Sequence, residues 1–266
     1  LIGRYCQKGM CSIMDVMQIE LENNSAPSLK DFIEKNNIQG IGFDLDSTLI
    51  DTTGYFDMAL IMTGMAVAER MESTVVNEEI AIEIRNIARE IYLENGNKPI
   101  LLTELFHKAI SRYRSEEFAL ETDSVVSDVL SFVYINSPDL YPETEKVLRY
   151  LKSLDFPVVV HSHSQQEWMN VKMNMIKEKT GIKLPSLATD INGEKDSQSW
   201  KDATSLLGLD ISEMLIVGDS LTSDILPALE AGCKHVVWLN HLGKELPEEL
   251  KDRVHVITKI GDLLYL

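Results

Sequence analysis

Two aspartates that flank a single leucine follow a short apolar run near the beginning of the chain. Asp44 and Asp46 come directly after residues 38–43, and Thr48 stands two positions further on. One carboxylate of such a pair can attack an electrophilic centre, and the other can donate or accept the proton that the reaction moves. If residues 38–43 form a buried strand, both carboxylates stand at its carboxyl end, where open α/β sheets bind their ligands.

Polar residues follow two later apolar runs in the same way. Ser162 comes after residues 158–160, and Asp219 comes after residues 214–217, with Asp224 about one helical turn beyond it. Because the carboxyl ends of parallel strands share one edge of a sheet, these side chains are expected to converge on the first pair. Carboxylates at such close quarters repel one another unless a hard cation lies among them, and an all-oxygen ligand set is typical of Mg²⁺. The predicted metal ligands are Asp44, Asp46, Asp219 and Asp224.

Alternating helical and apolar segments predict the sheet that positions these residues. Continuous apolar runs joined by helices indicate a parallel sheet that is buried on both faces. The predicted fold class is therefore α/β, with a doubly wound parallel sheet. Predicted strands lie at residues 38–43, 157–161, 214–218, 234–239 and 255–258, and predicted helices lie at 28–35, 142–151, 165–180 and 223–230.

Residues 52–137 interrupt this alternation with helices alone. Ile80, Ile84, Ile87 and Ile91 recur at spacings of four, three and four, which places them on one face of a helix. The segment is too long for an ordinary loop and is expected to form a helical domain of its own. The predicted organisation is an N-terminal leader at 1–27, an α/β core formed by 28–51 and 138–266, and a helical insertion at 52–137.

Two side-chain patterns within the insertion need an explanation. Methionines at helical spacing are expected to pack into the interior rather than to serve a cofactor. A basic cluster at helical spacing either covers a solvated face or recognises the substrate. The methionines are Met58, Met62 and Met65, and the basic residues are His107, Lys108, Arg112 and Arg114.

The order of the motifs resembles that of the haloacid dehalogenase-like (HAD) phosphohydrolase superfamily. FDLDSTLID fits its first motif, D-x-D-x-T, and VVVHSHS fits a second-motif strand that ends in Ser or Thr. GDSLTSD fits its fourth motif, G-D-x-x-x-x-D. The resemblance covers about residues 38–54 and 138–243. The helical insertion resembles a C1-type cap, which in this superfamily follows the first motif.

The third motif of the superfamily is a lysine, and two lysines are candidates for it. Lys195 lies twelve residues before the Leu207-Gly208 pair that precedes the fourth-motif strand, which fits the usual spacing. Lys201 lies six residues before Leu207 and falls in the helix that follows. The spacing favours Lys195.

The resemblance implies a role for each of these residues. Asp44 is the expected nucleophile, and Asp46 is the expected general acid and base. The ligands named above would hold Mg²⁺, and Asp46 would contribute its backbone carbonyl. The ion would offset the repulsion between an anionic nucleophile and an anionic phosphate. The predicted catalytic residues are Asp44, Asp46, Ser162 and Lys195, and the predicted phosphate-binding residues are Thr48, Ser162, His163 and Lys195.

Composition disfavours several other classes of partner. The chain has 25 Lys and Arg against 42 Asp and Glu, a formal net charge of −17 that repels nucleic acid and anionic membrane surfaces. Three cysteines, Cys6, Cys11 and Cys233, are too sparse for a disulfide framework. No run approaches the ~20 apolar residues of a membrane span. We therefore expect a cytoplasmic protein. The cap that the resemblance implies favours a small phosphorylated substrate, and the sequence leaves open whether the protein is a monomer or a dimer.

The second aspartate narrows the expected reaction. Dehalogenases of the superfamily lack it, because a halide leaving group needs no proton, so Asp46 favours phosphate esters. The predicted function is a Mg²⁺-dependent phosphatase that hydrolyses a small phosphorylated metabolite through an aspartyl-phosphate intermediate. A phosphomutase and a phosphoprotein phosphatase on the same core are the alternatives. A response-regulator receiver is disfavoured, because its phosphorylated aspartate follows the third strand.

Overall fold

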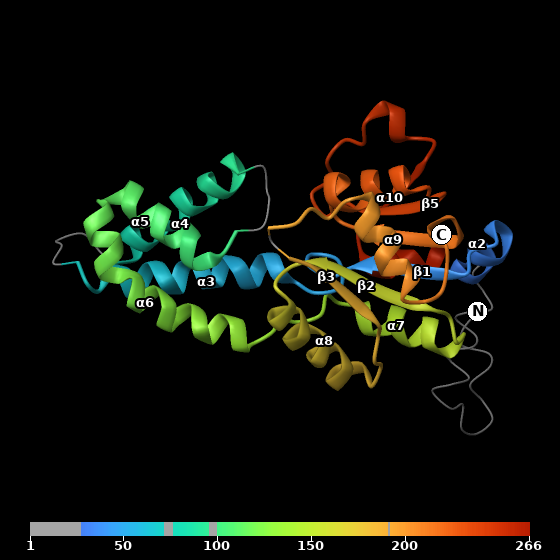
Figure 1. The fold of residues 1–266 in the computed structure, drawn as a ribbon, viewed down its shortest axis with the longest axis horizontal. Helices are drawn as coiled ribbons and strands as arrows, with labels where there is room; N and C mark the ends of the chain where they lie inside the picture. Colours follow the sequence, from blue (N-terminus) through green and yellow to red (C-terminus); the bar gives the residue numbers. More distant parts are fainter. Residues whose placement is uncertain (1–27, 72–76, 96–99, 191) are drawn as a thin grey trace, which may run out of the picture.

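The computed structural model describes residues 28–71, 77–95, 100–190 and 192–266 (Figure 1). The predicted leader at 1–27, which contains Cys6 and Cys11, lies outside the described residues. None of the described helices is both long and apolar enough to cross a membrane.

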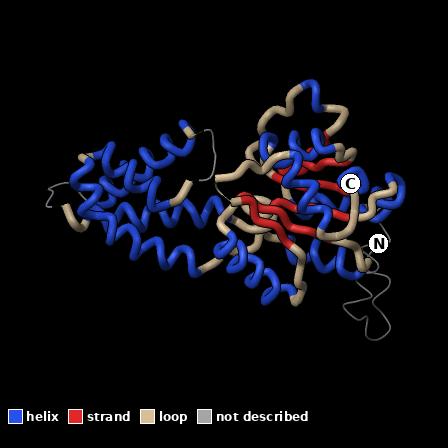
Figure 2. Tube along the Cα trace, in the orientation of Figure 1, coloured by secondary structure: helices blue, strands red, loops and turns tan. Residues whose placement is uncertain are grey.

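Six parallel strands form one sheet in the α/β core (Figures 1 and 2). Their order is β3-β2-β1-β4-β5-β6, with the first strand in the middle. Ile41 of β1 pairs with Val158 on one side and with Leu215 on the other. The prediction of a doubly wound parallel sheet is confirmed. The strands are β1 (Gly40–Asp44), β2 (Val158–His163), β3 (Ser186–Thr189), β4 (Met214–Gly218), β5 (His235–Leu239) and β6 (Val254–Ile257).

The edge strand β3 was not predicted from the sequence. Its four residues are all only half-buried, and they contain no continuous apolar run. Parallel pairing holds the strand in place, with Leu187 opposite His161 and Thr189 opposite His163. Pairing with a neighbouring strand, rather than a local hydrophobic pattern, therefore determines this element.

Helices cover both faces of the sheet, because successive strand residues point to opposite faces and are apolar on both. In β2, Val160 belongs to the hydrophobic core on one face, and Val159 belongs to the core on the other. Three helices pack on the first face and two on the second. The first three are α2 (Leu29–Asn36), α7 (Thr144–Ser153) and α8 (Gln166–Thr180), and the other two are α9 (Ser197–Ser205) and α10 (Leu226–Ala231).

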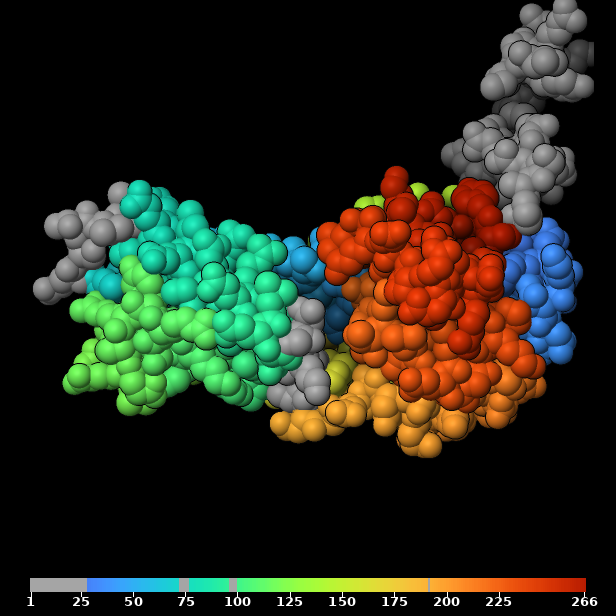
Figure 3. Space-filling model, turned by 90° about the horizontal axis from the view of Figure 1, so that it is seen from above, coloured from blue at the N-terminus to red at the C-terminus, as the bar shows by residue number. Residues whose placement is uncertain are grey.

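The described residues between 52 and 135 form an all-helical unit beside the sheet, which we call the helical insertion (Figure 1). Its helices share a hydrophobic core that contains Ile80, Ile84 and Ile91, with Ile87 packed against it. Figure 3 shows the insertion and the α/β core as two lobes. The helices are α3 (Thr52–Ala68), α4 (Asn77–Glu94), α5 (Leu102–Tyr113) and α6 (Glu116–Ile135).

The two connections between the helical insertion and the α/β core lie side by side. Ile50 and Leu140 form a short antiparallel bridge, and the Asp51 N–H donates to the carbonyl of Asp139 at 2.8 Å. The chain therefore leaves and re-enters the α/β core at one place, a few residues after Asp46. Any movement of the insertion relative to the sheet has to act through these two paired segments.

Side-chain burial corrects the expectation for the methionine stripe. Met58 and Met62 are 42% and 40% exposed, so the prediction that they pack inside is wrong. The buried face of α3 instead carries Leu60, Gly64 and Val67. Gly64 lets that face approach α4 closely, while Met58 and Met62 stand outside it.

The basic cluster of the insertion covers a solvated face, which is one of the two roles that its sequence pattern left open. Three of its side chains pair with carboxylates of the insertion, Arg114 lies over the ring of Phe118, and all four are partly or largely exposed. The pairs are His107 with Asp123 and Glu116, Lys108 with Glu104, and Arg112 with Glu94.

The close approach of α3 and α4 generates a prediction about stability. A Cβ at position 64 would lie 2.9 Å from both the Cα and the carbonyl oxygen of Ala81. Gly64→Ala should therefore lower the free energy of unfolding by about 1–3 kcal/mol, measured by urea denaturation. Gly54→Ala in the same helix is the matched control, because the atoms nearest to its Cβ would belong to the carboxyl group of Asp51, 3.1 Å or more away, rather than to a neighbouring backbone. The control should be neutral or up to about 1 kcal/mol more stable, and equal losses in both variants would contradict the packing explanation.

Candidate active site

The ends of two neighbouring strands bring the predicted carboxylates together. Asp44 is the last residue of β1, and Asp219 directly follows the last residue of β4. Asp224 lies in η3 (Leu221–Ile225), the turn that follows β4. One oxygen from each of these three aspartates lies within 4.8 Å of the others. The convergence that the strand ends predicted is therefore present.

Gly218 makes this convergence sterically possible. A Cβ at position 218 would lie 2.4 Å from Oδ2 of Asp224 and 2.5 Å from its Cβ. No side chain fits in that space, so the glycine before Asp219 allows β4 and η3 to pack closely. The Ser220 N–H then holds the Asp224 carboxylate, at 2.9 Å from Oδ2.

Lys195 lies between two of the three carboxylates. Its Nζ donates to Oδ1 of Asp44 at 2.5 Å and to Oδ1 of Asp224 at 2.6 Å, and all three groups are buried. Burial alone would lower the pKa of Lys195, but the two carboxylates outweigh burial and hold that pKa above its usual value. Lys201, the other candidate for the third motif, is exposed on α9. The geometry therefore supports Lys195.

Lys195 compensates only one of the negative charges of Asp44, Asp219 and Asp224. Burial and the neighbouring carboxylates raise the pKa of Asp44 to about 7, although Lys195 opposes the shift. The same causes raise the pKa of Asp219 well above its usual value. Oδ2 of Asp44 is buried and has no hydrogen-bond partner among the described residues. A buried oxygen without a donor, beside other carboxylates, fits a hard divalent cation such as Mg²⁺.

The side chain of Asp46 has a separate set of partners. Lys172 Nζ donates to both of its oxygens, at 2.7 and 2.8 Å. Ser162 Oγ donates to Oδ2 at 2.7 Å, and Thr52 Oγ1 donates to Oδ1 at 2.7 Å. Burial would raise the pKa of Asp46, but Lys172 and the two hydroxyl groups outweigh burial and lower it. Asp46 is therefore held as a carboxylate, and the metal ligand expected from it, a backbone carbonyl, stays a prediction.

The sequence motifs do not identify Lys172, although the sequence holds a signal for it. Lys172 is fully buried on α8, on the same side of the helix as Met169 and Ile176. A lysine three positions after one apolar residue and four before another lies on the apolar face of its helix, and its ammonium group needs a partner if it is buried there. The partner is Asp46, which lies 126 positions away in the chain. Helical spacing alone does not reveal it.

The three predicted phosphate-binding residues with neutral side chains stand in different surroundings. Ser162 is buried at the end of β2 and contacts Asp46. Thr48 is also buried, and its hydroxyl has no hydrogen-bond partner among the described residues. His163 points to the opposite face of the strand from Ser162, and burial together with Lys195 lowers its pKa. The geometry thus brings Ser162 to the site, while phosphate binding by Thr48 and His163 stays a prediction.

Aromatic side chains lie beside the carboxylates. Tyr141 packs against His241 with ring centroids 4.8 Å apart. Burial and nearby aspartates raise the pKa of Tyr141 to about 12. Tyr92 comes from α4 of the helical insertion, and burial together with the charges of Asp219 and Asp46 raises its pKa. The insertion therefore places one aromatic side chain within electrostatic reach of the site.

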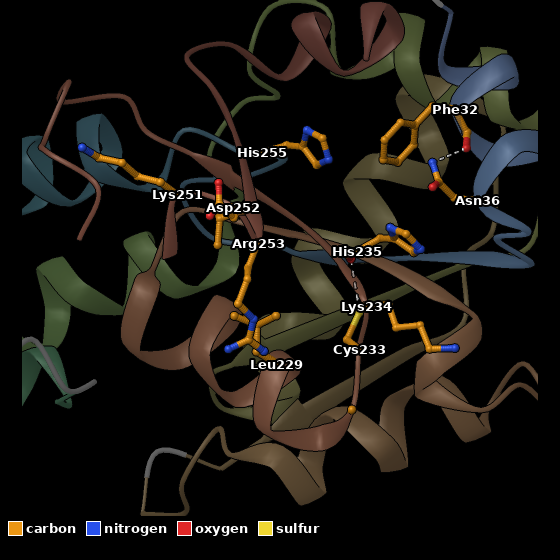
Figure 4. Close-up of a pocket in the computed structure, with 12 residues that line it drawn as sticks. Phe32, Asn36, Leu229, Cys233, Lys234, His235, Lys251, Asp252, Arg253 and His255 are labelled. Atoms are coloured by element: carbon orange, nitrogen blue, oxygen red, sulfur yellow. Dashed lines mark hydrogen bonds between the residues drawn. The ribbon is translucent and has the colours of Figure 1, made fainter. Parts of the chain in front are cut away.

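A separate surface hollow lies near the amino-terminal ends of β5 and β6 (Figure 4). Phe32 of α2 meets both His235 and His255 edge-on there, with ring centroids 6.0 and 5.0 Å apart. Because the carboxylates gather at the carboxyl ends of the strands, this hollow is not part of the candidate site.

The fold and the acidic cluster define the class, an α/β protein with a doubly wound parallel sheet and a candidate site at the carboxyl edge of that sheet. More particularly, the sequence matches the haloacid dehalogenase-like hydrolase family over residues 38–232. That span includes the helical insertion and all the acidic, serine and lysine residues of the candidate site described above. The chain therefore belongs to the haloacid dehalogenase-like hydrolases, as its motifs predicted.

Named relatives are similar over most of the chain. Phosphoglycolate phosphatase from Neisseria gonorrhoeae is 27% identical over 207 residues, which cover 75% of this chain and 79% of that protein. The protein of the same name from Neisseria meningitidis is 26% identical over 207 residues, which cover 75% of this chain and 80% of that one. Family and relatives together identify the chain as a HAD-type phosphatase.

Solved structures show the same fold at lower sequence identity. A HAD hydrolase from Bacillus subtilis, bound to magnesium, has a TM-score of 0.60 and 15% identity, and the match covers 85% of this chain and 96% of that one. A Thermotoga maritima protein assigned as a β-phosphoglucomutase has a TM-score of 0.60 and 14% identity, covering 85% and 97%. At these identities the likeness shows the shared fold alone.

The two candidate lysines generate a prediction about stability. Lys195→Met should lower the free energy of unfolding by about 3–5 kcal/mol, because it leaves Asp44 and Asp224 buried without their cation. Lys201→Met is the matched control and should change that free energy by less than about 0.5 kcal/mol. Urea denaturation without divalent ions measures both. Adding Asp224→Asn to Lys195→Met should recover part of the loss, and equal losses in the two single variants would exclude this role for Lys195.

Proposed function

We propose that this enzyme is a Mg²⁺-dependent phosphatase that hydrolyses a small phosphorylated metabolite through an aspartyl-phosphate intermediate. The observation that carries the proposal is the buried contact of Asp44 with Lys195 beside Asp219 and Asp224. Asp44 has one oxygen bound by Lys195 and another that is buried without a partner among the described residues. Asp44 and Lys195 together therefore provide an oriented carboxylate and the positive charge that an anionic substrate needs.

Asp44, Asp219 and Asp224 would hold Mg²⁺ through carboxylate oxygens, together with the carbonyl of Asp46. The bound ion would offset the negative charges of the nucleophile and the phosphate. When all four aspartates are ionised, the two buried lysines compensate two of their four charges. One divalent cation would neutralise the remaining two, which supports a single ion at this place.

In the first half-reaction, Asp44 would attack phosphorus in line with the ester oxygen that leaves. The bond between phosphorus and that oxygen breaks as the bond to Asp44 forms, and the leaving oxygen takes a proton from Asp46. Lys195 and Ser162 would bind the other phosphoryl oxygens, which carry the charge of the transition state.

In the second half-reaction, Asp46 would act as the base. It accepts a proton from water while the water oxygen bonds to phosphorus, and inorganic phosphate leaves as the Asp44 carboxylate is restored. Lys172, Ser162 and Thr52 hold Asp46 in the ionised form that this step needs. The first step needs the protonated form, which the approach of an anionic phosphate favours because a nearby negative charge raises the pKa of a carboxyl group.

The helical insertion favours a small substrate. Its two connections to the α/β core start beside Asp46, and Tyr92 of α4 lies within electrostatic reach of the carboxylates. Closure of such a unit over the site would exclude water from the first step and leave room for a compact leaving group. The names of the Neisseria relatives make phosphoglycolate the first substrate to test.

The proposed function predicts phosphate release from a panel of small phosphate esters that includes phosphoglycolate and p-nitrophenyl phosphate. Malachite-green detection should show turnover with Mg²⁺ and its loss when EDTA removes the ion. Asp44→Asn should abolish turnover, because an amide cannot form the aspartyl-phosphate. Hydrolysis of no ester by the wild-type enzyme would contradict the phosphatase proposal. Phosphoryl transfer between two hydroxyl groups of one sugar phosphate would instead establish a mutase.

The acid–base role of Asp46 predicts a dependence on the leaving group. Asp46→Asn should slow hydrolysis of an alkyl phosphate such as phosphoglycolate by about 100-fold or more, because its alkoxide must be protonated as it leaves. The p-nitrophenolate group leaves without a proton, so the first step on p-nitrophenyl phosphate should be much less affected. Burst kinetics separate that step from hydrolysis of the intermediate. An equal effect on the first step of both esters would contradict the acid role.

A further inference from the structure

Lys172 is a buried lysine that serves one carboxylate. Its side chain has no exposed surface, and its ammonium group donates to both oxygens of Asp46. Lys195, the other buried lysine of the site, contacts Asp44 and Asp224. The two cations are therefore divided between the two halves of the site. Lys195 lies with the nucleophile, and Lys172 lies with the proposed acid and base.

The ring of Trp168 packs against the ammonium group of Lys172. The ammonium nitrogen lies 4.1 Å from the centroid of the Trp168 ring, one helical turn earlier on α8. The indole N–H of Trp168 donates to the carbonyl of Asn136 at 3.3 Å, and Tyr134 meets the ring edge-on at 5.3 Å. Tyr134 and Asn136 stand where α6 ends and the chain returns to the α/β core. Trp168 thus joins Lys172 to the second connection of the helical insertion.

The first connection also reaches Asp46. Thr52, the first residue of α3, donates its hydroxyl to Oδ1, and Ser162 donates to Oδ2. The carboxylate therefore accepts four hydrogen bonds, two from Lys172 and one from each hydroxyl. Rotation of the carboxylate would break at least one of the contacts with Lys172. Its orientation is consequently set by α8 and by the start of α3.

We propose that Lys172, supported by Trp168, is a positioning residue that orients Asp46 for proton transfer to the leaving group. The inference rests on the phosphatase function proposed above. A buried ion pair is often no more stable than a well-packed apolar side chain of similar volume. Methionine would fill the place of Lys172 without the cost of removing an ammonium group from water. The charge at this position therefore serves the geometry of Asp46 rather than the packing of α8.

The leaving-group dependence tests this inference. Lys172→Met should lower kcat for phosphoglycolate, or for whichever alkyl phosphate the wild-type enzyme hydrolyses, by about 10- to 100-fold. The burst rate on p-nitrophenyl phosphate should fall by less than about threefold, because that step needs no proton from Asp46. Lys172→Arg should restore part of the lost turnover, since a guanidinium group can contact both oxygens of a carboxylate. Lys177→Met, at an exposed position of the same helix, is the matched control and should behave like the wild type.

A double-mutant cycle separates positioning from other roles. If Lys172 acts through Asp46, the variant with both Asp46→Asn and Lys172→Met should be no slower on the alkyl ester than Asp46→Asn alone. If the rate losses of the two single variants multiply in the double variant, the two residues act independently and the inference is overturned. An equal fall on both esters would also overturn it, as would a rise in KM for both without a change in kcat, which would indicate a phosphate-binding lysine.

A third variant keeps the test informative if Lys172→Met does not fold, which thermal melting would show. Trp168→Leu removes the ring beneath the ammonium group and the bond to Asn136, and it should produce the same selective loss to a smaller degree. An unchanged ratio of the two ester rates in a folded Trp168→Leu enzyme would overturn the inference. Should the wild-type enzyme hydrolyse no phosphate ester, the phosphatase proposal itself would fail. If Asp46→Asn slows the alkyl ester selectively but Lys172→Met does not, the positioning role of Lys172 is rejected and the phosphatase proposal stands.

Discussion

The crowding of negative charge at the carboxyl edge of the sheet is the constraint on which the rest of the structure depends. Strand ends and the turn η3 bring Asp44, Asp219 and Asp224 within one small space, with the Asp46 carboxylate beside them. Two buried lysines oppose this charge, and they come from different faces of the sheet. Lys172 belongs to α8 on one face, and Lys195 precedes α9 on the other. The doubly wound architecture is what lets cations reach the same edge from both sides.

This division of partners gives two aspartates of one motif opposite properties. Burial and the neighbouring carboxylates raise the pKa of Asp44 to about 7 against the opposing effect of Lys195, which also contacts Asp224. The pKa of Asp46 is lowered, because Lys172 and two hydroxyl groups all donate to it. Titratable groups whose surroundings separate their pKa values are typical of acid–base sites. The raised pKa of Asp44 agrees with a carboxylate that needs a cation, and the lowered pKa of Asp46 agrees with the ionised form that would act as the base in the second half-reaction.

The helical insertion is connected to the proton-transfer half of the proposed site. It begins with Thr52, which contacts Asp46, and it ends near Asn136, which accepts a hydrogen bond from Trp168 beside Lys172. Both contacts lie where the two connecting segments pair. An insertion placed directly after the aspartate motif can therefore affect the orientation of Asp46 through its two connections.

Apolar runs and the residues that follow them are local features, so the amino-acid order alone predicts the sheet, its strand ends and the acidic cluster. The resemblance to the HAD superfamily adds Lys195, because the third-motif lysine usually lies at this distance before the Leu207-Gly208 pair. Packing between distant segments is a different matter. The edge strand β3 exists because it pairs with β2, and Met58 is exposed because α4 packs on the opposite side of α3. Helical spacing places Lys172 on the apolar face of α8, but only the tertiary structure shows that it is buried and places Asp46 opposite it, because the two residues are 126 positions apart in the chain.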